Sequence, residues 1–417
     1  MLLQILNFDR AKRLNTTSQL ILPDNPVGGG RMRQKVVWFV LGVLVGSLFF
    51  ASAYPTGNNI QYVAPAVQKL PGSDYTTLLL YTPNGLPLNV KEIQRAVQEF
   101  VLKSAPNAKW HAYAVPELPK DAVLTGYGIK VTKDGRVNVL VLATRKGVPV
   151  QVTSIRSELM KWSTKKPEFQ EDIPLGEKIG VPEGWRVKTV DSSGNVRTYT
   201  GESEPYWHNF GKQELRYDAP PYGKLYAEFY MWGLWNDNDP RTETFACTKD
   251  SAGHGIYRVT PGILLKRHGV SGYKEYRIRK VEITHDWGVD PALKGELDDM
   301  APVGIINQYQ TVPINVGPVS YPLAVGGYKV YGDSIDPPAI WTIDTLGTGG
   351  TYTETSEHTV GIMVASSGDV LENVLHDGNW HAVINVKLWA EFSGNEHLIP
   401  TDIHHEWTAM TWYVKVG

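Results

Sequence analysis

Residues 380–392 read WHAVINVKLWAEF, and this stretch decides the fold class. Successive side chains of a β-strand point to opposite faces, so the pattern gathers apolar residues on one face and mainly polar ones on the other. Residues 406–416 alternate in the same way, with Met410 and Trp412 opposing Thr411 and Tyr413. Strict alternation predicts two antiparallel strands, each with one face packed on a core.

Similar strand patterns continue upstream, so residues 222–417 are predicted to form one antiparallel β-sandwich or jelly-roll-like domain. No helical pattern separates the candidates. The composition agrees, because Gly 40, Pro 27, Tyr 21 and Trp 13 favour turns and aromatic strands. The predicted strands are 224–232, 256–267, 273–285, 305–312, 328–331, 351–354, 359–365, 380–392 and 406–416.

One short motif supports the sandwich. The segment Asp377-Gly378-Asn379-Trp380-His381, just before an alternating strand, is similar to a turn–strand signature of laminin-G and concanavalin-like sandwiches. The resemblance covers about a dozen residues. It implies the fold alone and transfers no functional residue.

Residues 54–165 are predicted to form a small α+β domain. Asn89 is suited to cap a helix over 90–104, with Glu92 in capping-box position. Asp134-Gly135 between apolar runs predicts a hairpin of 124–132 with 136–144. The remaining elements of this domain are a strand over 77–81 and a strand leading into a short helix over 150–162.

Residues 166–221 are predicted to be a Pro/Gly-rich connector with one hairpin over 185–200, and 201–222 is read as turn-rich. The predicted fold is therefore mainly β: a C-terminal antiparallel β-sandwich or jelly-roll-like domain, preceded by a small α+β domain and an N-terminal hydrophobic export segment.

Residues 32–53 have the three parts of a secretory signal. Arg33 and Lys35 precede the uncharged run Val36–Phe50, and Ala51-Ser52-Ala53 forms a cleavage site. The alternative is an uncleaved anchor, because residues 36–53 are just long enough to span a bilayer. Either way the body is expected outside the cell or on its surface, with membrane contact only through residues 36–53.

Residues 1–31 fit this arrangement poorly and are predicted to be a non-native N-terminal extension. Gly28-Gly29-Gly30 stands just before Met32, and glycine codons begin with GG. Three of them can encode a purine-rich ribosome-binding site, so we expect Met32 to be the native start.

Charge excludes one class of partner. The formal net charge is −2, and removing residues 1–53 leaves 35 basic and 41 acidic residues. A mildly acidic body without a basic stripe does not attract phosphate backbones, so nucleic acid is not an expected partner. The single cysteine, Cys247, cannot form an internal disulfide.

An acidic segment is the candidate metal site. Calcium binds six to eight oxygen ligands, and five carboxylates lie close together in a loop-like stretch. The alternative interpretation is a solvated acidic loop. The candidate calcium ligands are Asp286, Asp290, Glu296, Asp298 and Asp299.

Aromatic residues beside short polar side chains are the candidate ligand site. Indole faces stack on the apolar faces of sugars, while Asp and Asn bind sugar hydroxyls. The same residues also describe an aromatic core strand running into a turn. The candidate ligand-binding residues are Trp232, Trp235, Asp237, Asp239 and Trp287.

No catalytic signature stands out. His404-His405-Glu406 lacks the second histidine that a zinc protease helix requires. The sequence therefore favours a non-catalytic exported protein that recognises a polysaccharide or a cell-envelope component. A secreted, calcium-dependent polysaccharide hydrolase and a filament, envelope or virion assembly subunit remain the alternatives.

Overall fold

The computed structural model describes residues 66–71, 74–167, 169, 172–174, 206–235, 248–261, 263–264, 274–306, 310–325, 329–334, 338–345, 360–396 and 399–416. These residues belong to one compact unit, Tyr62–Gly417. The predicted export segment, the extension 1–31, the hairpin over 185–200 and the strand over 351–354 lie outside the described residues. Within the described part of the chain, no helix is both long and apolar enough to cross a bilayer.

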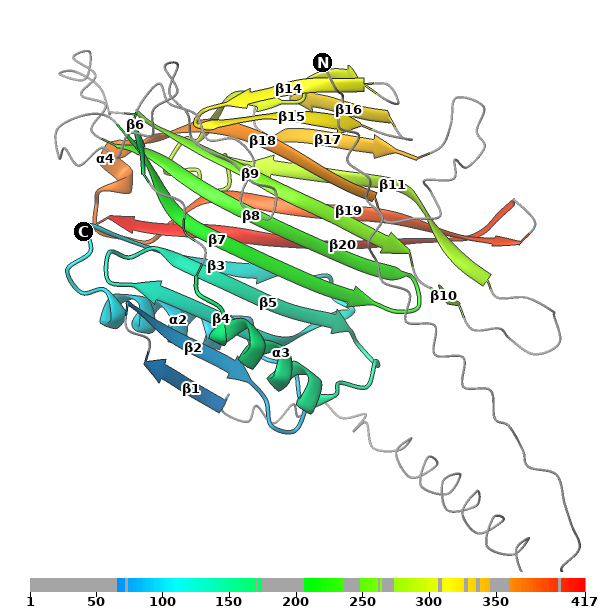
Figure 1. Ribbon diagram of the computed structural model, residues 1–417, viewed down its shortest axis with the longest axis horizontal. Helices are drawn as coiled ribbons and strands as arrows, with labels where there is room; N and C mark the ends of the chain where they lie inside the picture. Colours follow the sequence, from blue (N-terminus) through cyan, green and yellow to red (C-terminus); the bar gives the residue numbers. More distant parts are fainter. Residues whose placement is uncertain are drawn as a thin grey trace, which may run out of the picture. The chain divides into compact units, whose positions relative to one another are not determined.

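The fold is mainly β and mainly antiparallel, as predicted (Figure 1). Sheet A, the larger sheet, has ten strands among the described residues, in the order β1-β2-β4-β5-β7-β8-β9-β18-β12, with β6 paired to β7. Its strands are β1 (Ala66–Pro71), β2 (Tyr75–Tyr81), β4 (Ala122–Thr132), β5 (Val137–Arg145), β6 (Ile173–Pro174), β7 (Tyr206–Ala219), β8 (Gly223–Trp235), β9 (Thr248–Pro261), β12 (Glu296–Ala301) and β18 (Val360–Leu371).

Sheet B follows the order β13-β16-β17-β11-β19-β20-β3, with β10 paired to β11. A separate hairpin joins β14 (Gln310–Val316) to β15 (Val319–Val325). The strands of sheet B are β3 (Trp110–Glu117), β10 (Ile263–Leu264), β11 (Lys274–Asp286), β13 (Gly304–Ile306), β16 (Lys329–Ser334), β17 (Ala339–Asp344), β19 (His381–Glu396) and β20 (Ile399–Val416).

The two alternating stretches that predicted the fold class are β19 and β20, which pair with each other. Their apolar faces are buried in a core that both sheets share; Leu388, Phe392 and Trp412, for example, are at most 1% exposed. Helix α4 (Glu372–Leu375) stands just before β19.

Two helices cover opposite faces of the first strands of sheet A. Helix α2 (Val90–Ser104) begins as predicted, with the Asn89 side chain accepting a hydrogen bond from the backbone N–H of Lys91 at 2.9 Å. Leu78 and Leu80 share the main core with α2, whereas Leu79 packs in a separate cluster with α3 (Val152–Thr164). Because both faces of β2 are covered, its sequence is a continuous apolar run rather than an alternating one.

The predicted division into an α+β domain (54–165), a connector (166–221) and a sandwich (222–417) needs correction. Strand β3 pairs with the last strand, β20, and β5 pairs in parallel with β7. Strands from both sides of the predicted boundaries therefore share each sheet, and Tyr62–Gly417 is one compact unit.

Three local predictions were wrong. Residues predicted as turn-rich form β7, and residues 152–164 are entirely helical rather than a strand leading into a helix. Strand β17 was missed although its burial alternates residue by residue. The hairpin predicted around Asp134-Gly135 is confirmed as β4 and β5, with Gly135 at a φ of 94°.

A buried carboxylate ties the two sheets together. Glu406 on β20 accepts a hydrogen bond from the Tyr217 hydroxyl of β7 at 2.8 Å, and Arg145 Nε lies 3.3 Å from its other oxygen. Burial raises the pKa of the Glu406 carboxyl. The segment His404-His405-Glu406 is thus part of a strand, as expected, and its glutamate has a structural partner on each of two sheet A strands.

Candidate functional site

The outward face of sheet A carries an ordered set of polar side chains on β7 and β8. On β7, the alternate residues Lys212, Glu214 and Arg216 share this face, because strand side chains repeat every second residue. The matching residues on β8 lie directly opposite them in the antiparallel register: Tyr230, Glu228 and Tyr226.

One row across this face places an aromatic ring between two cations. The register aligns Arg216 on β7, Tyr226 on β8 and Arg258 on β9. The guanidinium of Arg216 lies 5.9 Å from the centre of the tyrosine ring, and that of Arg258 lies 5.7 Å from it. Gly361 continues the row on β18, so Arg258 has no side chain beyond it there.

The neighbouring row would be unfavourable without compensation, because Glu214 and Glu228 are directly opposite. Lys212 Nζ lies 3.0 Å from Glu228 and 3.6 Å from Glu214. Burial alone would raise the pKa of the Glu228 carboxyl, but Lys212 and the hydroxyls of Tyr226 and Tyr230 hold that pKa below its ordinary value. This network fixes the ring of Tyr226 from its hydroxyl end.

An open groove of about 540 Å³ lies at one end of these rows. Helix α3 and the loop before it form one wall, and the ends of β5, β7, β8 and β9 form the other. The volume falls within the range of small-molecule sites. The polar residues lining it are Thr125, Thr144, Gln151, Ser154, Glu158, Arg216, Tyr217, Asp218, Lys224, Tyr226, Arg258 and Thr260.

The charges of the groove are unevenly compensated. Arg216 contacts Glu158 of α3 at 2.5 Å and Glu214 at 2.8 Å, and Lys224 lies 3.4 Å from Asp218. Arg258 is exposed and lies against the ring of Tyr226. The groove therefore combines hydroxyl and amide side chains with one guanidinium that no carboxylate of the described residues neutralises.

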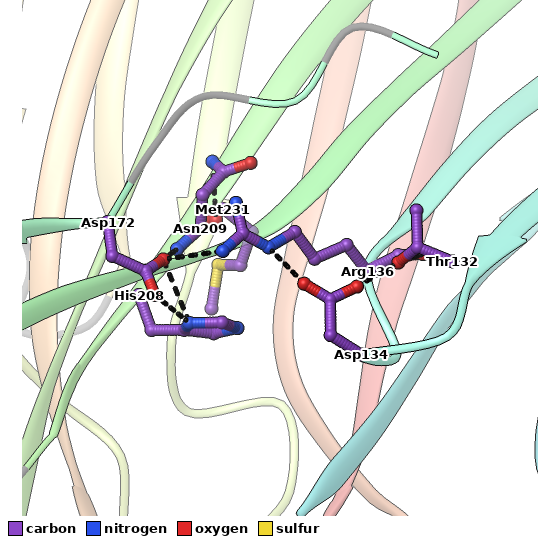
Figure 2. A network of polar contacts seen from close by, with 7 residues as sticks. All are labelled: Thr132, Asp134, Arg136, Asp172, His208, Asn209 and Met231. Atoms are coloured by element: carbon purple, nitrogen blue, oxygen red, sulfur yellow. Dashed lines mark hydrogen bonds and ion pairs between the residues drawn. The ribbon is translucent and has the colours of Figure 1, made fainter. Parts of the chain in front are cut away.

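A second polar cluster joins three separate segments of sheet A (Figure 2). Asp172, just before β6, accepts a hydrogen bond from His208 Nδ1 at 2.9 Å and from the backbone N–H of Asn209 at 3.2 Å. Nη2 of Arg136, in the turn just before β5, lies 3.1 Å from the same carboxylate. Burial would raise the pKa of Asp172, but His208 and Arg136 hold it below its ordinary value.

The same arginine reaches the β4–β5 turn, since its Nε lies 3.0 Å from Asp134, which also binds the Thr132 hydroxyl (Figure 2). The cluster thus fastens the short strand β6 to the hairpin and to β7. The ring of His208 is buried beside Trp110 and Phe210, at centroid distances of 4.5 Å and 5.6 Å. Among the described residues its Nε2 has no hydrogen-bond partner. With its histidine packed between aromatic rings and its other members paired with one another, the cluster acts as a structural tie.

Two of the predicted ligand-binding tryptophans are buried, which corrects the prediction. Trp287 is fully buried and donates its indole N–H to the Ser366 hydroxyl at 3.0 Å. Trp232 is also fully buried, in a cluster with Trp207 and Leu234. Neither ring has a free face on which a ligand could stack.

The other three members of that predicted site do not extend it. Trp235 is half-buried and lies edge-on to Phe210, with ring centres 6.1 Å apart. Asp237 and Asp239 lie outside the described residues, so for them the sugar-binding role remains a prediction.

The predicted calcium site is not assembled. Asp290 accepts a hydrogen bond from His381 Nδ1 at 3.0 Å, and Asp377 contacts His381 Nε2 at the same distance. Both ring nitrogens face carboxylates, and the doubly protonated imidazole can donate to both. Burial alone would lower the pKa of His381, but the two carboxylates raise it above its ordinary value. Asp290 thus has His381 as its partner rather than a metal ion.

The remaining predicted ligands point to different partners. Asp286 binds the backbone N–H of Gly288, Asp298 accepts from the Ser367 hydroxyl, and Asp299 lies beside the N–H of Met300. Glu296 is exposed at the start of β12. Within the part of the chain that the structure describes, no three acidic, histidine or cysteine side chains come close enough to hold a metal ion.

The residues of the groove were missed in the sequence although a signal for them existed. The alternation Lys-x-Glu-x-Arg over 212–216 and Tyr-x-Glu-x-Tyr over 226–230 marks two polar faces in register. The Pro- and Gly-rich residues around it predict turns, so local sequence does not assign this alternation to a strand. Arg258 carries no such signal, since its position in the row depends on long-range strand pairing.

No protein-family model matches the chain, and no curated protein matches it. Among solved structures, Clostridium perfringens delta-toxin gives a TM-score of 0.34 at 8% identity, over 51% of this chain and 95% of that chain. A structure titled "Pore forming protein" gives 0.32 at 8% identity, over 51% and 93%. The C. perfringens NetB toxin in its membrane-inserted form gives 0.26 at 8% identity, over 49% and 94%.

TM-scores of this size define no common fold, so the likenesses assign the chain to no family. The class that the structure itself defines is a mainly β protein of two large packed sheets, with an open polar groove on one outer face.

Proposed function

We propose that this protein is exported and binds a polysaccharide in the groove beside α3. The observation that carries the proposal is the groove itself: an open space of about 540 Å³ lined by hydroxyl, amide and charged side chains on rigid strands and one helix. Sugar hydroxyls need donors and acceptors held at fixed positions, which strands supply better than loops.

The groove suits a polar ligand rather than an apolar one. Ser154 and Thr144 line opposite walls; the Thr144 hydroxyl donates to the Asp218 carbonyl at 2.9 Å and keeps its acceptor capacity, and Gln151 adds an amide at the start of α3. Tyr226 is no open stacking platform, because a guanidinium lies on either side of it along the row. Recognition would therefore rest on hydrogen bonds and charge, with the aliphatic residues of the loop before α3 covering the apolar faces of the sugar.

A steric block tests the site. Ser154 on α3 lines the groove and is exposed, so Ser154→Trp should fill it and weaken binding about tenfold or more, which corresponds to about 1.4 kcal/mol. Ser157→Trp is the matched control, because Ser157 is exposed on the same helix and does not line the groove. Binding is measured calorimetrically with soluble neutral and acidic polysaccharides. If wild type binds none of them, or Ser154→Trp binds as wild type does, the proposal fails.

Export is tested separately. The full coding sequence is expressed, and the protein is recovered from outside the cells, from the membrane fraction and from the cytosol. The proposal expects material outside or membrane-tethered, with a mature N-terminus near Tyr54 if the signal is cleaved after Ala53. A product found soluble inside the cells with residues 36–50 intact contradicts it.

A further inference from the structure

We infer that the ligand of the groove is an anionic saccharide and that Arg258 binds its acidic group. The inference rests on the proposed function and specifies the ligand class. It follows from the charge balance of the groove, in which Arg216 and Lys224 already have carboxylate partners within 3.4 Å.

Arg258 differs from these two cations in its surroundings. It is exposed and lies against the ring of Tyr226, so the described residues leave the N–H groups of the guanidinium for a ligand. The two lining carboxylates, Glu158 and Asp218, are occupied by the other two cations. An acidic group on the ligand would therefore meet one uncompensated positive charge and no uncompensated negative one.

The fold also holds this guanidinium in place. Its aliphatic stem rises from a central strand, β9, and its head lies over Tyr226, whose hydroxyl is bound to Glu228. On its other side in the row is Gly361, which has no side chain; a Cβ built there would lie 3.6 Å from Cγ of Arg258. The ring of Tyr226 thus supports the guanidinium on one flank, and the described residues place no side chain in this row on the other. A side chain supported in this way loses less freedom when a ligand binds.

A guanidinium fork matches a planar carboxylate through two parallel hydrogen bonds, and it also binds a sulfate ester. Both groups occur on acidic polysaccharides, and both would satisfy the site. The hydroxyl and amide side chains of the groove would contact the remaining sugar hydroxyls, so the ligand we expect carries hydroxyls and an anionic group together.

The test compares three tetrasaccharides with the full-length mature protein: 1,4-linked galacturonate, the same compound with its carboxyl groups reduced to alcohols, and a sulfated form of the reduced compound. Wild type should bind an anionic form at least about tenfold more tightly than the reduced form, and the preference should shrink at high salt. Which anionic form binds distinguishes carboxylate from sulfate recognition.

The variants locate the effect. Arg258→Gln should lose about tenfold in affinity for the anionic form and little for the reduced one, whereas Arg258→Lys should recover part of the loss. Arg156→Gln, on the exposed face of α3, removes a charge away from the groove and should change neither. The unfolding midpoint of each variant verifies that the fold is intact.

Two failures are distinguishable. If wild type binds the reduced and anionic compounds equally, or if Arg258→Gln retains the full preference, this inference is overturned while polysaccharide binding stands. If wild type binds none of the three and no other polysaccharide, the proposed function falls as well.

Discussion

The buried hydrogen bonds of His285 between the two sheets permit a quantitative prediction. Its Nε2 lies 2.7 Å from the Tyr257 hydroxyl of β9, and its Nδ1 lies 2.8 Å from the Ser366 hydroxyl of β18. His285 itself belongs to β11 of sheet B, and all three residues are fully or almost fully buried. A neutral imidazole has one N–H and one acceptor nitrogen, so one hydroxyl donates to it and the other accepts.

The substitution His285→Leu keeps a similar volume and removes both hydrogen bonds. The Ser366 hydroxyl still accepts a hydrogen bond from the indole N–H of Trp287, so the loss of its bond to His285 should cost about 1 kcal/mol. The buried Tyr257 hydroxyl would lose its hydrogen bond to His285, at a cost of about 1–3 kcal/mol. The free energy of unfolding should therefore fall by about 2–4 kcal/mol.

The assay is a double-mutant cycle with Tyr257→Phe, using urea unfolding followed by tryptophan fluorescence and circular dichroism. Replacing both partners leaves no unsatisfied group at that contact, so the double variant should be about 1–2 kcal/mol more stable than the sum of the single effects implies. Tyr217→Phe is the matched control, because its hydroxyl binds Glu406 and shares no partner with His285. Additivity within about 0.5 kcal/mol in the Tyr257 cycle would refute the reasoning.

Three further predictions concern other ties. His381→Gln should destabilise the protein most in mild acid. The pKa of His381 is raised in the folded state, so its contribution to stability is complete below the pKa of the unfolded state and is lost as pH rises through the pKa of the folded state. A difference in unfolding free energy that does not depend on pH would contradict this. The buried side chain of Lys130 donates hydrogen bonds of 2.7 Å to the carbonyls of Trp162 and Lys165 at the end of α3. Lys130→Met removes both bonds, so the free energy of unfolding in urea should fall by about 2–4 kcal/mol. A fall of less than about 0.5 kcal/mol would count against this prediction. Gly211→Ala should lower the free energy of unfolding by at least about 2 kcal/mol, because the φ of Gly211 is 127° and the new Cβ would lie 1.8 Å from the carbonyl oxygen of Val137. Gly361→Ala is the control, since a Cβ there would make ordinary contacts. Equal stability of the two variants would contradict the prediction.

The parts of the fold that local chemistry determines could be predicted from the sequence. Strands β19 and β20 follow from strict alternation, α2 from its Asn89 cap and apolar spacing, and the β4–β5 hairpin from Asp134-Gly135. Each signal lies within a few residues of the element that it predicts.

What could not be predicted depends on pairing between distant segments. Strand β7 alternates over 212–216, but a bulge between Asn209 and Gly211 interrupts the pattern in the first half of the strand. The parallel pairing of β5 with β7 leaves no mark in either segment. Trp287 was misjudged for a related reason: a tryptophan in a loop-like sequence suggests a binding surface, but its indole N–H is used inside the core by Ser366.

The pairing of β3 with β20 has a consequence for how the chain can acquire its structure. In the part of the chain that the structure describes, residues 110–117 pair only with residues 409–416. Strands that are far apart in sequence must close a long loop before their hydrogen bonds form, so this pairing is expected late in folding. Until β20 is in place, β3 presents an unpaired edge, and completion of sheet B therefore depends on two distant segments meeting.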